Sequence, residues 1–519
     1  MLILDSHCHI QSIPGHPWDS PASRLVPLLD EAGIHCALVM GYGEASSENP
    51  ELIHQMDTAM EQYPDRLLAL ARLEPKESAP ETLRNLVDSD RGFVGLKLHP
   101  VGYRLPPDHP HVINLLKMAG QLGIPSLFHC GDEEYSLPLQ IARAARQVPE
   151  AKIILGHMGG YFHVDDALQA AQECPNIYLE TSAMPFPHLV NLCVKELGAD
   201  RVFFGSDGPG CLPALEVQKI YLAQLSEAQI REVLGEAYLR ILRPKDQLKV
   251  LKMSEVTRSP HEAPQRNESI PLDCRVHVRT ADRVKKSGGL WRVAGMDHTQ
   301  LLSSMRANRI ERACLVSGYN PCSYLKANDH IKKLAREQDH YYWCRIDPLD
   351  PGSDSQSSEY LKEKDCAGLF FHPFEENLAC SATSFLTFIS QLQKYFRPNQ
   401  YLMIAGGYPL VSQAEQIAHL ASNVDLSILA TSAGQIDICG AHLQGALSMM
   451  REHSNVSVET SGIYRQDFIE DLVHEFGADR VRFGSGAPGF EMSYEAARFR
   501  WLHGDQMKAV AQDFINIEK

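Results

Sequence analysis

Six side chains in the first half of the chain combine residue types that bind metals with positions at the ends of short apolar runs. They are His7, His9, Lys97, His129, His157 and Asp207. In a strand, residues two apart share a face, so His7 and His9 can point the same way while Cys8 points away. Imidazole and carboxylate groups together suit Zn²⁺, Mn²⁺ or Fe²⁺, and an open position on such an ion lowers the pKa of a bound water to about 7.

The elements that must position these side chains are strands that alternate with amphipathic stretches, such as His111–Gln121, over the first 240 residues. We expect eight strands, at Leu2–Ile10, Ile34–Gly41, Leu67–Leu73, Phe93–His99, Ile124–His129, Lys152–His157, Asn176–Thr181 and Arg201–Asp207. Eight βα units of this total length predict a (β/α)₈ barrel of the TIM type. The C-terminal ends of all its strands converge on one face, so the six side chains should meet in one pocket.

The second half of the chain repeats this pattern. LDCRVHV from Leu272 echoes LDSHCHI from Leu4, and GADRVRFGSGAPG from Gly477 matches GADRVFFGSDGPG from Gly198 at ten of thirteen positions. We therefore predict tandem barrels at residues 1–242 and 270–519, separated by a charged, proline-containing linker over residues 243–269.

The motifs DSHCHI, GLKLHP, FHCG, GHMGG and FGSDGP follow one another on the expected strands of the first half. In this order they resemble the amidohydrolase superfamily, in particular amidohydrolase family 2, which includes enzymes similar to aminocarboxymuconate-semialdehyde decarboxylase. The resemblance implies that His7, His9, His129 and Asp207 bind one divalent metal, with Zn²⁺ expected first and Mn²⁺ or Fe²⁺ as alternatives. It also implies that His157 polarises the substrate or transfers a proton, and that Asp207 takes a proton from the activated water.

Lys97 leaves two alternatives open. In binuclear members of the superfamily a carboxylated lysine on the fourth strand bridges two metals, so a second metal is expected only if Lys97 is carboxylated. A free ammonium could instead hold a substrate carboxylate or carbonyl. His99 could line the pocket, and Arg72 could either hold an anionic substrate or pair with Glu74.

The second half has lost most of this set. Aligning the two halves by their letters places Arg275, Phe370, Ile404, Thr431 and Gly486 at the positions of His7, Lys97, His129, His157 and Asp207, and only His277 and His372 persist. An arginine repels a cation and no carboxylate replaces Asp207, so we expect this degenerate barrel to bind no metal. Glu180 and Thr181 recur as Glu459 and Thr460, which favours a structural role at the end of the seventh strand. One hypothesis for the second barrel is an intrachain pseudo-dimer with the first.

Three functions follow from these observations. The first is hydrolysis of a small-molecule ester, lactone or amide by a metal-activated water, with Asp207 and His157 as the catalytic pair. The second is non-oxidative decarboxylation of a small unsaturated or aromatic acid, which needs one metal and an uncarboxylated Lys97 to hold a carboxylate. The third is a binding or regulatory protein without turnover, which the intact ligand set of the first half disfavours.

The bulk composition restricts the partners. The 519 residues carry a net charge of −16 and a pI near 5.8, which argues against nucleic acid or an anionic membrane as a partner and leaves a small molecule, including a carboxylate. The start MLILDSHCHI has no basic segment followed by an apolar run, and the 13 cysteines look like reduced core thiols. We therefore expect a cytoplasmic protein.

Overall fold

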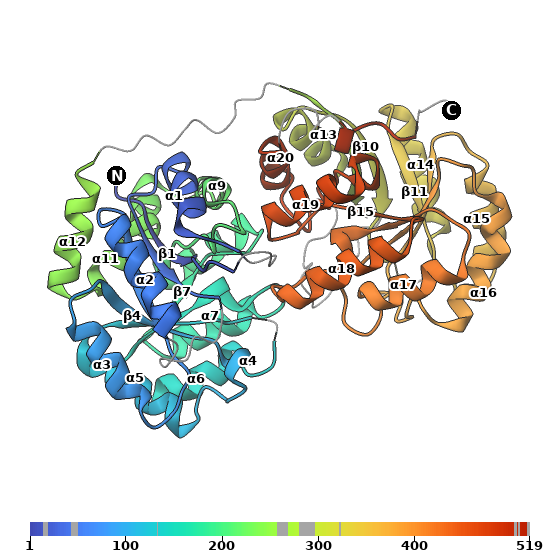
Figure 1. Cartoon of the computed structure of the whole chain (residues 1–519). Coiled ribbons are helices and arrows are strands. Elements are labelled where there is room, and N and C mark those ends of the chain that lie inside the picture. Colours follow the sequence, from blue (N-terminus) through green and yellow to red (C-terminus); the bar gives the residue numbers. More distant parts are fainter. Residues whose placement is uncertain are drawn as a thin grey trace. The chain divides into compact units, whose positions relative to one another are not determined.

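The computed structural model describes residues 1–13, 19–42, 50–131, 133–256, 268–279, 296–320, 323–502, 506 and 509–515. It divides into two compact units, Met1–Pro264 and Gln265–Lys519. Each unit contains one eight-stranded parallel sheet in which every strand pairs with its neighbour in sequence, and helices surround the strands (Figure 1). The predicted tandem (β/α)₈ architecture is confirmed.

In the first unit, short apolar strands alternate with helices that bury one face. The strands are β1 (Leu4–His9), β2 (Cys36–Met40), β3 (Leu67–Arg72), β4 (Phe93–Leu98), β5 (Pro125–Phe128), β6 (Lys152–Leu155), β7 (Ile177–Glu180) and β8 (Val202–Phe203). The helices are α1 (Ala22–Glu31), α2 (Pro50–Gln62), α3 (Ala79–Asp88), α4 (Pro100–Tyr103), α5 (Pro110–Leu122), α6 (Pro138–Gln147), α7 (Val164–Glu173), α8 (Pro187–Leu197), α9 (Pro213–Leu222), α10 (Glu227–Arg231), α11 (Ala237–Ile241) and α12 (Pro244–Ser254). The strands are buried on both faces, as a barrel covered by helices requires.

The first barrel closes where the segment after β8 meets β1. The backbone N–H of His9 donates to the carbonyl of Gly208 at 2.8 Å, and that of Asp207 donates to the carbonyl of His7 at 2.7 Å. The buried carboxylate of Asp5 adds a side-chain bond, because it accepts from the backbone N–H of both His7 (3.1 Å) and Ser206 (2.9 Å). Closure therefore places residues 7, 9 and 207 next to one another at the C-terminal ends of the strands, which we call the mouth of the barrel.

The second unit repeats the order of strands and helices. Its strands are β9 (Ile270–Val278), β10 (Ile310–Ser317), β11 (Tyr341–Arg345), β12 (Cys366–Phe371), β13 (Tyr401–Ile404), β14 (Ile428–Ala430), β15 (Val456–Glu459) and β16 (Val481–Arg482). Its helices are α13 (His298–Ala307), α14 (Leu325–Glu337), α15 (Ser353–Leu361), α16 (Thr383–Leu392), α17 (Ala414–Asn423), α18 (Gly440–Glu452), α19 (Gln466–Phe476) and α20 (Met492–Arg500). Asp273 repeats the role of Asp5, since it accepts from the backbone N–H of Arg275 (3.1 Å) and Ser485 (2.9 Å).

The prediction of a linker over residues 243–269 is wrong for its first part. Residues 244–254 form helix α12, which lies beside α11 (Figure 1). Val250 and Met253 are buried in the same core cluster as Leu4 and Leu38, so the helix belongs to the first unit. Val250 and Met253 are three residues apart and lie among lysines and polar residues. Such a narrow apolar face does not mark a helix clearly in a charged segment, so the sequence did not reveal it. Residues 257–267 of the predicted linker lie outside the described residues.

Two positions of the internal alignment are also wrong, each by one residue. The backbone N–H of Ala405 donates to Phe371 as that of His129 donates to Leu98, so Ala405 replaces His129. The backbone N–H of Ser432 donates to Glu459 as that of His157 donates to Glu180, so Ser432 replaces His157. These two loops share too few letters to fix the register, and the strand pairing supplies it.

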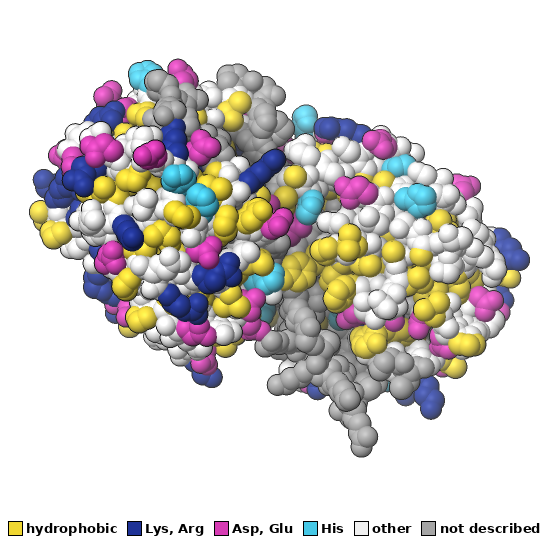
Figure 2. Space-filling view, turned by 90° about the horizontal axis from the view of Figure 1, so that it is seen from below, with side chains coloured by type: hydrophobic (Ala, Val, Ile, Leu, Met, Phe, Trp, Pro, Cys, Tyr) yellow, Lys and Arg dark blue, Asp and Glu magenta, His cyan; other side chains and the backbone are white. Residues whose placement is uncertain are grey.

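The surface carries charges of both signs. On the face in Figure 2, the Lys and Arg side chains of the described residues lie scattered between acidic and apolar ones over both units. Among the helices that the structure describes, none is long and apolar enough to cross a membrane.

Candidate metal centre

Three of the four predicted ligands meet at the mouth of the first barrel. A carboxylate oxygen of Asp207 lies 3.1 Å from Nε2 of His9 and 3.6 Å from Nε2 of His7. One ligand atom from each of the three side chains lies within 4.8 Å of the others. We call His7, His9 and Asp207 the inner set. Their elements are β1 and the turn after β8, which barrel closure brings together.

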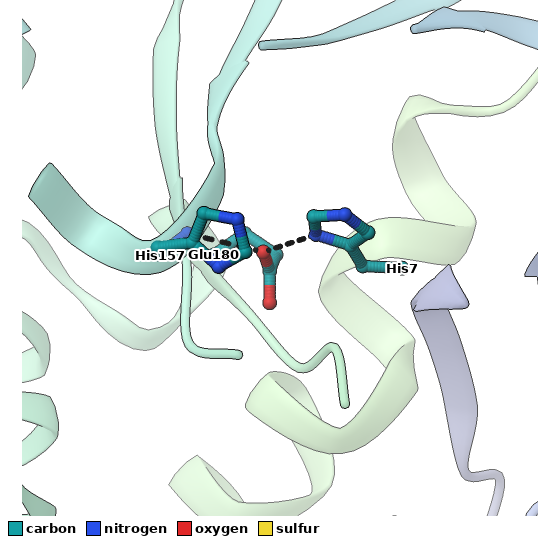
Figure 3. Close-up of side chains that lie close together, drawn as sticks. All are labelled: His7, His157 and Glu180. Carbon is teal, nitrogen blue, oxygen red and sulfur yellow. Dashed lines mark hydrogen bonds and ion pairs between the residues drawn. The ribbon is translucent and has the colours of Figure 1, made fainter. Parts of the chain in front are cut away.

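The orientation of His7 is fixed by Glu180 at the end of β7. Glu180 Oε2 lies 3.0 Å from Nδ1 of His7 and 3.3 Å from the backbone nitrogen of His157, so the carboxylate sits between the two histidines (Figure 3). Burial and the nearby Lys97 hold the pKa of His7 well below its usual range, so the imidazole is neutral and donates its Nδ1 proton to Glu180. Nε2 then carries the lone pair and faces Asp207, as a metal ligand requires.

Nδ1 of His157 also carries a proton and donates it to a neighbouring residue, Ser182. Its Nδ1 lies 3.0 Å from the hydroxyl oxygen of Ser182 and 3.3 Å from the Ser182 carbonyl. The Ser182 hydroxyl donates to Glu180 at 2.9 Å, so both Ser182 oxygens accept from His157 and Nδ1 carries the proton. Nε2 of His157 is therefore a proton acceptor in the neutral ring.

The backbone at two site residues is strained. His157 has φ 60° and Asp207 has φ 61°, in the left-handed region that side chains other than glycine rarely adopt. Such conformations cost about 1–3 kcal/mol each and persist where the surrounding structure enforces them. His157 lies two residues beyond the end of β6 and Asp207 four residues beyond the end of β8, and both take part in the cluster at the mouth.

The charge states of these groups suit cation binding. Burial lowers the pKa of His9, and it lowers the pKa of both His129 and His157 to about 4, so their imidazoles are neutral at neutral pH. Burial alone would raise the pKa of Asp207. The hydrogen bond with His9 and the neighbouring His7 and His157 have the larger effect and hold the pKa of this carboxyl well below its usual range. Neutral imidazoles and an ionised carboxylate are the forms that coordinate divalent metals.

His129, the fourth predicted ligand, lies in a different cluster. Its Nε2 is 2.8 Å from Oε2 of Glu133, and its ring packs edge-on against His99 with centroids 4.6 Å apart. Its ring centroid is 5.0 Å from that of His157, which in turn is 4.9 Å from that of His7. The mouth thus holds a continuous row of imidazoles, in which His129 borders the inner set without joining it.

Lys97 contacts the inner set directly. Its Nζ lies 2.8 Å from Nε2 of His7, the nitrogen that would bind a metal. Lys97 is fully buried, and it also acts electrostatically on His9, His129 and His157. Nη1 of Arg72 donates to the backbone carbonyl of Gly41 at 2.9 Å. This backbone contact is neither of the two partners that the sequence suggested, an anionic substrate and Glu74.

The donor set fits a divalent cation. Two neutral imidazoles and one carboxylate match the preferences of Zn²⁺, Mn²⁺ and Fe²⁺, and Nδ1 of His9 is buried without a hydrogen-bond partner among the described residues. Lys97 opposes such an ion, because its amine contacts the Nε2 lone pair of His7.

The mouth of the second barrel is filled by an arginine. The Arg275 guanidinium contacts Glu459 at 3.2 Å, Ser461 and His277, the last at 3.3 Å. A Cβ added at Gly486, the position of Asp207, would lie 2.6 Å from Nη2 of Arg275. The guanidinium therefore occupies the space of the lost aspartate, and it is the positive charge that faces Glu459.

Four contributing residues were missed or underestimated from the sequence. They are Asp5, Glu133, Glu180 and Ser182. Glu180 recurs in the second half, which suggested a structural role. The structure shows that Asp5 and Glu180 hold His7 on β1, and that their counterparts Asp273 and Glu459 hold Arg275 on β9. Glu133 lies in a loop, where no periodicity marks it.

Comparisons with known proteins found one family model and a group of similar solved structures. A family model described as amidohydrolase matches residues 5–243. Among solved structures, the chain is similar to a 2,6-dihydroxybenzoate decarboxylase from Rhizobium, with 20% identity and a TM-score of 0.37 over 46% of this chain and 98% of the other. It is also similar to a 5-carboxyvanillate decarboxylase from Sphingomonas paucimobilis, with 15% identity and a TM-score of 0.39 over 47% and 99%. A dihydroxybenzoic acid decarboxylase from Polaromonas with bound manganese and an inhibitor matches at 19% identity, with a TM-score of 0.38 over 46% and 96%. A search of curated proteins found no match.

Proposed function

The first unit belongs to the amidohydrolase family over residues 5–243, and from this premise we propose that it is a metal-dependent hydrolase of a small-molecule ester, lactone or amide. The observation that carries the proposal is the inner set, in which two neutral imidazoles and an ionised carboxylate converge within 4.8 Å at the mouth. We expect Zn²⁺ first, with Mn²⁺ and Fe²⁺ as alternatives, held by His7, His9 and Asp207 and joined by His129 after it leaves Glu133.

When bound, a divalent cation would supply Lewis-acid polarisation of a carbonyl oxygen and would make water a stronger acid. The side chains then divide the proton transfers. Asp207, ionised at neutral pH, accepts a proton at its carboxylate, and His157 accepts or returns one at Nε2 because Nδ1 is committed to Ser182. This network favours the proton-transferring role for His157 over the polarising role, since a neutral ring has no second proton to donate.

Lys97 supports a second candidate, non-oxidative decarboxylation. Its buried amine lies among the histidines of the mouth, 2.8 Å from His7, where it could hold a substrate carboxylate. The reaction replaces the carbon–carboxylate bond by a carbon–hydrogen bond, and the proton that this needs comes from water; His157 can pass it on at Nε2 only after that nitrogen has accepted it. Release of one CO₂ for each substrate consumed distinguishes this reaction from hydrolysis.

The test is the metal content of the full chain, measured by inductively coupled plasma mass spectrometry on the wild type and on Asp207→Ala. We expect about one equivalent in the wild type after equilibration with a micromolar concentration of Zn²⁺, and its loss in the variant. A wild type that binds none after reconstitution with Zn²⁺, Mn²⁺ or Fe²⁺ contradicts both enzyme proposals. The loaded protein is then assayed on esters, lactones and amides for acid release, and on aromatic acids for CO₂.

For the second unit we propose a catalytically silent role as the intrachain partner of the first. The supporting observation is local: the guanidinium of Arg275 fills the position that a metal and Asp207 would share. A cytoplasmic location stays a prediction from the composition.

A further inference from the structure

A second group of potential ligands lies at the outer edge of the same mouth. His99 follows β4 and His129 follows β5, and these strands pair with Lys97 opposite Leu127. The backbone N–H of His129 donates to the carbonyl of Leu98 at 2.9 Å, which continues the pairing and sets the two histidines side by side. Their rings meet edge-on at 4.6 Å.

Glu133 completes this group from the loop between β5 and α6. The Ser136 backbone N–H and hydroxyl both donate to the carbonyl of Glu133, at 3.1 Å and 2.9 Å, so the loop folds back on itself. This turn sets the Glu133 carboxylate 2.8 Å from Nε2 of His129. The side chains of His129 and Glu133 are 11% and 20% exposed, which leaves an ion a route from solvent.

We propose that His99, His129 and Glu133 form a second divalent-cation site, the outer site, distinct from the inner set. One ligand atom from each residue lies within 4.8 Å of the others, and two imidazoles with one carboxylate suit Zn²⁺, Mn²⁺ or Fe²⁺. The outer site rests on the proposed function only in sharing His129 with the inner metal. Because Nε2 of His129 can bind one ion at a time, filling the outer site removes His129 from the inner one.

The second barrel provides an internal comparison. Its loop from Gly407 to Ser412 closes with the same hydrogen bond as Gly131 to Ser136 and has the same length, so Pro409 stands where Glu133 is. Ala405 replaces His129, and only His372 remains of the outer group. The barrel that lost two of the three inner ligands has thus lost two of the three outer ligands as well, as expected if both groups serve metal binding.

The experiment is equilibrium dialysis of the full chain against increasing Zn²⁺, followed by metal analysis. The variants are Glu133→Gln, Asp207→Asn and the two combined, and Glu134→Gln is the matched control because it removes an exposed carboxylate from the same loop. We expect two equivalents in the wild type and the control, one in each single variant and none in the combined variant. The dissociation constant of the weaker equivalent should rise at least tenfold in Glu133→Gln.

The outcomes separate the two proposals. If Glu133→Gln binds as much Zn²⁺ as the wild type with unchanged affinities, the outer site is wrong and the inner one stands. If Asp207→Asn changes nothing while Glu133→Gln loses metal, the outer site stands and the inner one fails. A second equivalent that survives Glu133→Gln but disappears in Lys97→Met belongs to a lysine bridge, which also overturns the outer site.

Discussion

Glu180 and Glu459 occupy the same place in the two barrels and hold different partners. Glu180 accepts from His7, whereas Glu459 accepts from Arg275. A carboxylate that accepts from a ligand histidine fixes its tautomer and ring orientation, and its loss costs about 10- to 100-fold in metal affinity.

Glu180→Gln should therefore raise the dissociation constant for Zn²⁺ about 10- to 100-fold while the first unit stays folded. Competition with a chelator of known affinity gives this value. Glu459→Gln is the matched control, because it changes the equivalent residue in the barrel whose mouth holds Arg275, and the affinity of the first unit for Zn²⁺ should stay the same. An unchanged affinity in Glu180→Gln would show that another group orients His7.

Lys97 makes a prediction that separates its two roles. If it is an ammonium, it competes with the metal for Nε2 of His7, and Lys97→Met should tighten Zn²⁺ binding about tenfold or more, because unit charges about 4 Å apart repel by roughly 4 kcal/mol near a protein surface. If it is a carboxylated bridge, the same variant loses an equivalent of metal. Isothermal titration calorimetry measures affinity and stoichiometry together. If neither changes, Lys97 does not act on the metal at this centre.

The sequence could predict the inner set because its three members end neighbouring strands of a recognisable barrel. It could not predict that His129 turns toward Glu133, since that contact depends on the course of a loop. Nor could it show that Nδ1 of His157 is committed to Ser182, which decides what the other nitrogen can do. Assignment of the ligands to a bound metal remains a prediction that the experiments above test.

At the scale of elements, α12 shows that a charged segment can be structural. Val250 is fully buried in the core cluster against the barrel strands, whereas Leu248, two residues earlier, is 61% exposed. Val250→Ala should lower the free energy of unfolding of the first unit by about 1–3 kcal/mol through lost burial and a residual cavity. Leu248→Ala should change it by less than about 0.5 kcal/mol.

Thermal or urea unfolding followed by circular dichroism checks this pair of variants. Equal effects at the two positions would mean that α12 does not pack as described. The eight strands of the first unit were predictable because they are short apolar runs, and their alternation with helices specifies the topology. The register of the copy was not predictable, because strands that share so few letters are aligned only by their hydrogen bonds.

At the scale of the whole molecule, the two units differ in what neutralises the glutamate at the mouth. In the first this charge would come from the proposed metal, and in the second it comes from Arg275. A ligand at 100 times its dissociation constant stabilises the folded state by about 2.7 kcal/mol. Adding a chelator should therefore lower the unfolding temperature of the first unit by several degrees and leave that of the second unchanged.

Differential scanning calorimetry of the full chain, with and without chelator, measures both transitions. Asp207→Asn identifies the transition of the first unit, because this variant should show no response to chelator. If both transitions shift together in the wild type, the units do not unfold separately or the second also binds metal.

The contact between Arg275 and Gly486 has a consequence for the history of the duplicated barrel. Returning an aspartate to position 486 places its Cβ 2.6 Å from the guanidinium and requires φ near 61°, so the Arg275 side chain must move to make room for it. Returning a histidine to position 275 alone removes the buried cation that faces Glu459. The two positions are therefore coupled: an aspartate fits at position 486 without displacing the guanidinium only after the arginine at position 275 has been replaced, so the order of the two mutations decides whether each step fits.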